Sequence, residues 1–247
     1  MDTPLSARPR LPEIWTAAYT DLTRIVRDMY PALAIICALY LVTAIGWFTL
    51  PLLVDTSLGR MVMRFLLLVG CAYVAAPYYV ALHRFIAMGE VRWIPPRDAH
   101  FPAADVYTAW AAFTQLILLG PLLLVSVLDD FRLGTLGVLL FPELQLLSWW
   151  LLVRLATLLP MAALTPERAS FRRALSHTDG RFLHVLMATT APAVPAYVAL
   201  MVLAQAAANR TIEAIPWMLM ALAALLAMQM LPLSVATRLY WRVRNEG

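Results

Sequence analysis

The chain contains no lysine, only two cysteines and few charges of either sign. All 19 of its basic residues are arginines, which is typical of a GC-rich bacterial genome, and 14% of its 247 residues are charged. Soluble domains are about 25% charged. Apolar residues make up 62% of the chain, and its mean hydropathy is +0.74. A chain with this many apolar residues and this few charges is not soluble in water. A soluble globular domain is therefore excluded, and an integral membrane protein is expected.

Recognisable catalytic and metal-binding motifs are also missing. Cys37 and Cys71 lie in apolar runs without C-x-x-C spacing, where thiols behave as small hydrophobic groups. The histidines show no H-E-x-x-H pattern, and there is no P-loop, G-x-S-x-G elbow or paired-carboxylate spacing. The sequence therefore predicts no cofactor, no metal and no enzyme activity. The net charge of +4 does not indicate nucleic-acid binding, because arginines that flank membrane spans account for it.

Six apolar segments have the length of about 20 residues that a membrane-spanning helix needs. They cover residues 31–53, 64–86, 106–128, 135–159, 183–208 and 214–239. The predicted fold class is an all-α polytopic membrane protein with a single transmembrane domain over residues 1–247. In this domain a surface helix (12–30) precedes spans one to four (31–159), and a second surface helix (165–182) precedes spans five and six (183–240).

The arginines are distributed unequally between the two sides of these spans. Fourteen flank the spans on the side of the N- and C-termini, four lie on the opposite side, and Arg154 lies within span four. Because positive charge accumulates in cytoplasmic segments, both termini are predicted to be cytoplasmic, in a bacterial inner membrane.

Two stretches have the mixed pattern of helices that lie along a membrane surface. In 12–30 one helical face carries apolar residues, and the remainder carries charged ones. The apolar face comprises Ile14, Trp15, Ala18, Leu22, Ile25, Val26 and Met29, and the charged residues are Glu13, Asp21, Arg24, Arg27 and Asp28. In 165–182 Thr165 is predicted as the N-cap, Pro166 as the first helical residue and Gly180 as the stop. Both helices are expected to turn their arginines toward anionic headgroups.

Residues 153–186, VRLATLLPMAALTPERASFRRALSHTDGRFLHVL, resemble a pattern in six-span bacterial membrane proteins. The pattern has an arginine in span four, a proline, an amphipathic helix and a turn, here Arg154, Pro160, Ala169 to Ala174 and Thr178 to Phe182. It is similar to the YciC-like inner-membrane proteins and to the membrane domain attached to some glycerophosphodiester phosphodiesterases. An acidic residue often found after that proline is absent, with Ala163-Leu164 in its place. The resemblance implies a fold but no activity, because the phosphodiesterase catalysis resides in a separate soluble domain.

Three polar residues of span four are candidates for a functional role. An ionisable residue within a span is a functional hypothesis by default. Glu143 and Gln145 lie beside Pro142, whereas Arg154 follows eleven residues after Glu143, about 16 Å along a helix, so the two cannot pair directly. The structural alternative is that Arg154 snorkels to the interface or pairs with Glu167 or Asp179. We favour the pair, which would hold the second surface helix against span four.

Two groups of residues form candidate cytoplasmic docking elements: Arg92, Trp93 and Arg97 in the loop 88–102, and Arg172 and Arg173 in the second surface helix. Headgroup contact is the alternative explanation for both groups.

Two functions remain open. We expect a non-catalytic accessory or scaffold protein that packs against another membrane complex or organises membrane components. The alternative is a small permease-like transporter of an apolar or amphipathic solute. The expected partners are the lipid bilayer and another membrane protein. A transporter predicts a polar cavity containing Glu143 or Arg154, whereas a scaffold predicts a packed interior.

Overall fold

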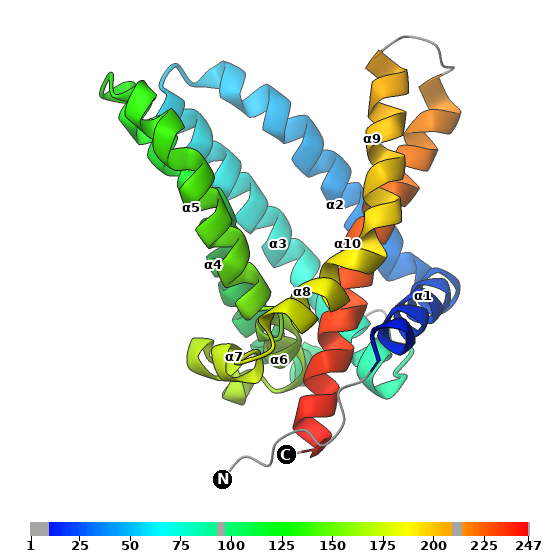
Figure 1. The fold of residues 1–247 in the computed structure, drawn as a ribbon. Coiled ribbons are helices and arrows are strands. Elements are labelled where there is room, and N and C mark those ends of the chain that lie inside the picture. Colours follow the sequence, from blue (N-terminus) through cyan, green and yellow to red (C-terminus); the bar gives the residue numbers. More distant parts are fainter. Residues whose placement is uncertain (1–9, 93–96, 209–213, 247) are drawn as a thin grey trace.

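The structure, a computed structural model, describes residues 10–92, 97–208 and 214–246, and every regular element in these ranges is helical (Figure 1). The α-helices are α1 (Leu11–Asp28), α2 (Tyr30–Thr49), α3 (Ser57–Met88), α4 (Arg97–Asp130), α5 (Gly134–Arg154), α6 (Leu158–Leu164), α7 (Phe171–His177), α8 (Phe182–Thr190), α9 (Val194–Ala208) and α10 (Ala214–Glu246). Single 3-10 turns are η1 (Leu50–Leu53), η2 (Pro166–Arg168) and η3 (Ala191–Ala193).

Six helical stretches of the described residues are long and apolar enough to cross a membrane. They are Tyr30–Trp47, Ser57–Met88, Pro102–Asp130, Gly134–Leu164, Phe182–Leu203 and Met220–Asn245. The all-α, six-span fold class is thereby confirmed. Span two begins earlier than the predicted residue 64, because Thr56 caps α3 by accepting a hydrogen bond from the Gly59 N–H. Helices α3 and α4 are thus longer than the apolar segments from which the sequence predicts them.

Spans one to four form one group, in which α2 contacts α3, and spans five and six form the other. The two groups converge on one side of the molecule (Figure 1). Helix α3 packs along α4, and α4 packs along α5, while α9 pairs with α10. In the figure the upper part of this α9–α10 pair stands apart from α3, α4 and α5, whereas the lower half of α10 contacts α1, α3, α6 and α8. We call the converging end the α1 side.

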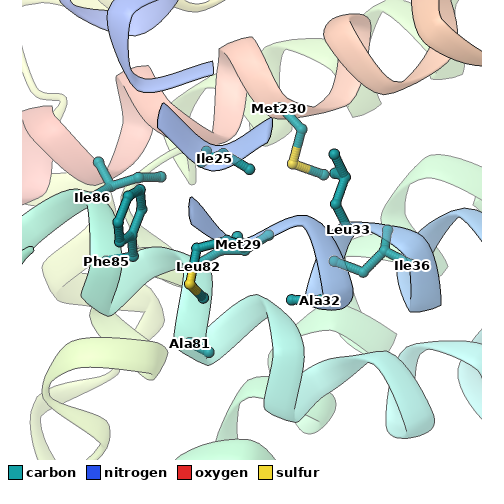
Figure 2. Packing of buried hydrophobic residues seen from close by; sticks show 10 residues of the cluster. All are labelled: Ile25, Met29, Ala32, Leu33, Ile36, Ala81, Leu82, Phe85, Ile86 and Met230. Carbon is teal, nitrogen blue, oxygen red and sulfur yellow. The ribbon is translucent and has the colours of Figure 1, made fainter. Parts of the chain in front are cut away.

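A hydrophobic cluster holds α1, α2, α3 and α10 together on this side (Figure 2). Met29, at the break between α1 and α2, is fully buried, and so are Ile25 before it and Ala32 after it. Leu82 and Phe85 from α3 and Met230 from α10 complete the packing around them. Burial of apolar residues on both sides of the break therefore sets the angle at which the surface helix enters span one.

Helix α1 confirms the predicted helix 12–30 but corrects two assignments within it, Val26 and Asp21. Ile14, Ala18 and Ile25 are buried as the pattern predicts, whereas Val26 is 53% exposed. Asp21, which we placed on the charged face, has only 1% of its surface exposed. Its carboxylate is buried because α10 supplies partners for it, and a buried charge is tolerated when it is paired and hydrogen-bonded.

The predicted helix 165–182 is wrong as a continuous element. The 3-10 turn η2 comes first, extended backbone follows at Ser170, and only α7 is α-helical. Ser170 caps α7 by accepting a hydrogen bond from the Arg173 N–H, whereas the side chain of Thr165 makes no cap bond and instead hydrogen-bonds to Tyr240. Gly180 does end the segment, in the left-handed region at φ +63°.

Candidate functional site

A cavity of about 500 Å³ lies where the two groups of spans converge. Its walls come from α2, α3, α4, α5, α6, α8 and α10, and most of its lining is apolar. The polar lining residues are Tyr40, Tyr79, His83, Tyr107, Thr114, Gln115, Thr189, Thr190 and Gln229. Among the described residues that line the cavity, none is an arginine, aspartate or glutamate.

Interruptions of spans four and five, together with a proline inside span six, contribute to the cavity wall. Span four breaks between α5 and α6, and Ala156 in this break and Pro160 just after it line the cavity. Thr190 lines it at the end of α8, where η3 bends span five, and Pro232 lines it within α10. Proline removes a backbone donor and prevents regular helical packing at that point. The breaks therefore leave space between helices that straight spans would fill.

Three tyrosines form a connected wall between α2, α3 and α4. The hydroxyl groups of Tyr40 and Tyr79 lie 2.7 Å apart and form a hydrogen bond. The Tyr79 and Tyr107 rings are stacked with their centroids 5.9 Å apart. No hydrogen bond of the Tyr107 hydroxyl is found within the described part of the chain, although this residue is buried. The wall thus combines aromatic surface with a small number of hydroxyl groups.

His83 links this wall to α10 and has one ring nitrogen without a partner. Nδ1 lies 2.6 Å from the Thr237 hydroxyl oxygen, and that hydroxyl donates its proton to the Leu233 carbonyl at 2.7 Å. Because the hydroxyl has a single proton, it accepts from Nδ1–H. His83 is buried and no described lining residue is acidic, so the ring is in its neutral form, in which Nε2 is an unprotonated acceptor. Nε2 is buried and has no hydrogen-bond partner among the described residues.

Asp21 joins α1 to α10 beside this region. One of its carboxylate oxygens accepts hydrogen bonds from the Ser234 hydroxyl at 2.6 Å and from Arg238 Nε at 2.5 Å. The other accepts from Arg238 Nη2 at 2.6 Å, so the arginine binds the carboxylate through two nitrogens. This paired geometry orients both side chains and fixes the register of α1 against α10.

Arg154 contacts the turn that follows α7. Its Nη1 donates to the Thr178 carbonyl at 3.0 Å, and both Nη atoms lie 3.2 Å from one oxygen of Asp179, which is 80% exposed. In return the Thr178 hydroxyl donates to the Arg154 carbonyl at 2.8 Å. Of the two acidic partners suggested by the sequence, the structure brings Asp179 to Arg154.

The other polar candidates of this region lie apart from both Arg154 and the cavity. Glu143 is exposed and Gln145 half-buried on α5, and neither lines the cavity. Glu167 is exposed in η2 and forms no ion pair with any described residue. The cavity of the described structure therefore contains neither Glu143 nor Arg154, which the transporter alternative predicted there, and is built from different residues.

The candidate docking residues do not form one site in the described structure. Arg92, Arg172 and Arg173 are exposed, and Arg173 Nη1 donates to the Arg168 carbonyl at 3.2 Å. Trp93 and the side chain of Arg97 lie outside the described residues. Within the described ranges no group of three or more histidine, cysteine or acidic side chains is placed to hold a metal ion.

Sequence reasoning missed the cavity residues, although a signal for them exists. Tyr79 and His83 are four residues apart in α3, and Tyr107 and Gln115 lie on α4 with Ala111 between them, four residues from each. This spacing places each pair on one helical face, so polar or aromatic groups recur along single faces of apolar spans. Which of these faces point toward one another depends on helix packing.

Comparisons of the chain with protein-family models, with curated proteins and with solved structures find no match, so the site is interpreted from its own geometry.

Proposed function

We propose that this protein binds an apolar or amphipathic, lipid-like solute in the cavity between the two groups of spans and moves it within the membrane. The observation that carries the proposal is the cavity itself. Its volume of about 500 Å³ falls within the range of about 300–1,000 Å³ typical of small-molecule sites. A largely apolar lining with a few convergent polar groups is also typical of such sites.

The rim of the cavity supports entry from the lipid. Trp149, which lines the cavity from α5, is 54% exposed, and Gln229, which lines it from α10, is also exposed. The cavity therefore reaches the surface of the chain between two spans. A solute already dissolved in the bilayer could enter through this opening without first passing through water.

The depth of the cavity in the membrane fits the same function. Gln115 lies near the middle of the span Pro102–Asp130, whereas Tyr107 and His83 lie near the ends of their spans at Pro102 and Met88. Binding sites in transporters typically lie near the bilayer midplane, where interrupted helices meet. A solute bound here would extend from the interface on the α1 side to the middle of the membrane.

The accessory or scaffold role stays a prediction, as do the resemblance to YciC-like proteins, the bacterial inner membrane and the cytoplasmic position of both termini.

Exposed large apolar side chains are spread over α2, α3, α5 and α9. Such a distribution is what contact with lipid requires, and it does not single out one face for a protein partner. We propose no catalytic step.

Photolabelling in vesicles tests the binding proposal. Long-chain probes with a photoreactive diazirine in the chain are offered as a fatty alcohol, its methyl ether and a fatty acid. We expect at least one of them to label peptides from α3, α4 and α10 that line the cavity. Ala156→Phe should reduce this labelling, because the added ring occupies the cavity. Ala44→Phe, on an exposed position of α2, is the matched control and should not reduce it.

Failure of every probe to label the lining residues, or equal labelling of the Ala156→Phe and unmodified proteins, would show that the cavity is not a solute site. Movement is measured separately, as the rate at which a labelled solute changes leaflet in vesicles with and without the protein. An unchanged rate would leave binding in place and refute transport.

A further inference from the structure

His83 and its surroundings determine the kind of polar group that the cavity accepts, an inference that rests on the proposed function. The side chain is 1% exposed, lines the cavity and has Nε2 buried without a partner. A buried acceptor without a hydrogen bond destabilises the folded protein, because it has lost its bonds to water without a replacement. A solute that donates a proton to Nε2 would remove this destabilisation.

The charges of the lining restrict the solute further. No arginine, aspartate or glutamate is among the described lining residues, and His83 donates through Nδ1 to Thr237 as a neutral imidazole. Burial of an ionised phosphate or carboxylate without a counter-charge is far more costly than burial of a neutral polar group. The cavity is therefore suited to an uncharged headgroup.

Most of the other polar groups of the cavity already have partners within the protein. The Thr189 and Thr190 hydroxyls donate to the carbonyls of Val185 and Leu186, and the Tyr40 and Tyr79 hydroxyls bond to each other. The amides of Gln115 and Gln229 and one hydroxyl proton of the Tyr40–Tyr79 pair also face the cavity. His83 Nε2 and the Tyr107 hydroxyl differ from these groups because they lie side by side, with their rings 5.7 Å apart, as an acceptor next to a donor. A hydroxyl group, which both donates and accepts, matches this pair.

We infer that the solute is a neutral long-chain alcohol-type lipid whose hydroxyl donates to His83 Nε2 and accepts from Tyr107. Helix α3 has 32 residues and is about 48 Å long, whereas the hydrocarbon core of a bilayer is about 30 Å thick. His83 near its end therefore lies close to the interface on the α1 side. The hydroxyl binds there, and the chain extends toward the middle of the membrane past Gln115 and Leu118.

Competition against the photoreactive alcohol tests this inference in the unmodified protein. Hexadecanol, hexadecyl methyl ether and palmitate at alkaline pH share a chain length but differ in the head. The ether oxygen can accept but not donate, so we expect it to compete roughly three- to tenfold less well than the alcohol, which corresponds to one neutral hydrogen bond. Palmitate, which is ionised, should compete least.

Substitution of His83 assigns the difference to Nε2. In His83→Phe the alcohol and the ether should compete equally. Thr43→Val, which removes a hydroxyl on α2 that donates to the Leu39 carbonyl and does not line the cavity, should keep the difference. Equal competition by alcohol and ether in the unmodified protein would overturn the inference, and so would tighter binding of palmitate. Either result would leave the proposed function intact, because the probe would still label the cavity, whereas absence of labelling by all probes refutes the function itself.

Discussion

Asp21 is a buried carboxylate that joins α1 to α10. It shares α1 with Asp28, and both have arginine partners, but Asp28 pairs with the adjacent Arg27 at the surface, and Asp21 pairs with Arg238 across two helices. The hydrogen bond from Arg27 lowers the pKa of Asp28 from its ordinary value. The two carboxylates thus offer a comparison of a buried and an exposed ion pair within one helix.

We predict that Asp21→Asn destabilises the protein by about 2–3 kcal/mol, because the amide has no negative charge and offers one acceptor oxygen where the carboxylate offers two to Arg238 and Ser234. Thermal unfolding in detergent should show a Tm lower by roughly 5–10 °C. Asp28→Asn on the same helix is the control and should leave the Tm nearly unchanged, because exposed pairs contribute little. A similar Tm for both variants would mean that the buried pair does not hold α1 to α10.

Gly180 is a residue whose backbone conformation affects the stability of the protein. At φ +63° it lies in a region that side chains with a Cβ rarely adopt, although nothing lies within 4 Å of the position that a Cβ would take. We therefore predict that Gly180→Ala costs about 1–2 kcal/mol through backbone strain alone.

Gly70→Ala is the matched control, because it lies within α3 and also has open space around its Cβ position. This substitution should stabilise the protein by about 0.5–1 kcal/mol, since alanine favours a helix over glycine. Chemical denaturation of both variants measures the two changes, and a loss of stability in Gly70→Ala as large as in Gly180→Ala would refute the backbone explanation.

At the scale of elements, the end of α5 is connected to the turn after α7 by reciprocal hydrogen bonds. Arg154 donates to the Thr178 carbonyl, and Thr178 donates to the Arg154 carbonyl. These bonds hold a short helix of seven residues, which could not persist alone. The direction in which α8 leaves the turn, and therefore the beginning of span five, depends on this connection.

We predict that Arg154→Ala lowers the stability by about 1–3 kcal/mol and speeds amide hydrogen exchange in α7 and the following turn. Arg154→Lys should recover only part of the loss, because one ammonium group cannot reproduce the forked contacts. Arg172→Ala, an exposed arginine of α7, is the control for loss of charge. Should Arg154→Ala retain its stability but lose solute binding, the residue has a functional role instead.

At the scale of the whole molecule, α1 and the last turns of α10 lie together on the α1 side. Ile14 and Ala18 of α1 pack against Leu231 and Val235 in the second half of α10. Six spans of the described residues follow α1, so the end of α10 lies on the same side as α1. The fourteen-to-four distribution of arginines then predicts that this whole side, with the surface elements α1 and α7, faces the cytoplasm.

Fusions to alkaline phosphatase, which is active only in the periplasm, test this orientation. A fusion at the C-terminus should be inactive, whereas a fusion at Phe131, in the exposed turn between α4 and α5, should be active. The reverse pattern would mean that the molecule is inserted in the opposite orientation.

The sequence by itself determined the helical class, the number of spans and the helical nature of α1. These features follow from local properties, since about 20 apolar residues in succession satisfy their backbone groups in lipid only as a helix. Proximity in the sequence also suggested Glu167 and Asp179 as partners of Arg154, and the structure shows the pair with Asp179. Local spacing did not anticipate the irregular segment at Thr165–Ser170, since Thr165 is engaged by Tyr240, a residue far along the chain.

The tertiary structure alone decided which polar residues meet. His83, Tyr107 and Gln229 come from three spans, and only the packing of α3, α4 and α10 brings them to one cavity. Asp21 is buried for the same reason, because its partners lie on the last span. In the lipid-facing spans all side surfaces are similarly apolar, so hydropathy cannot indicate which face of a helix contacts another helix and which contacts lipid. The site is therefore a product of helix packing, whereas the spans that carry it are a product of composition.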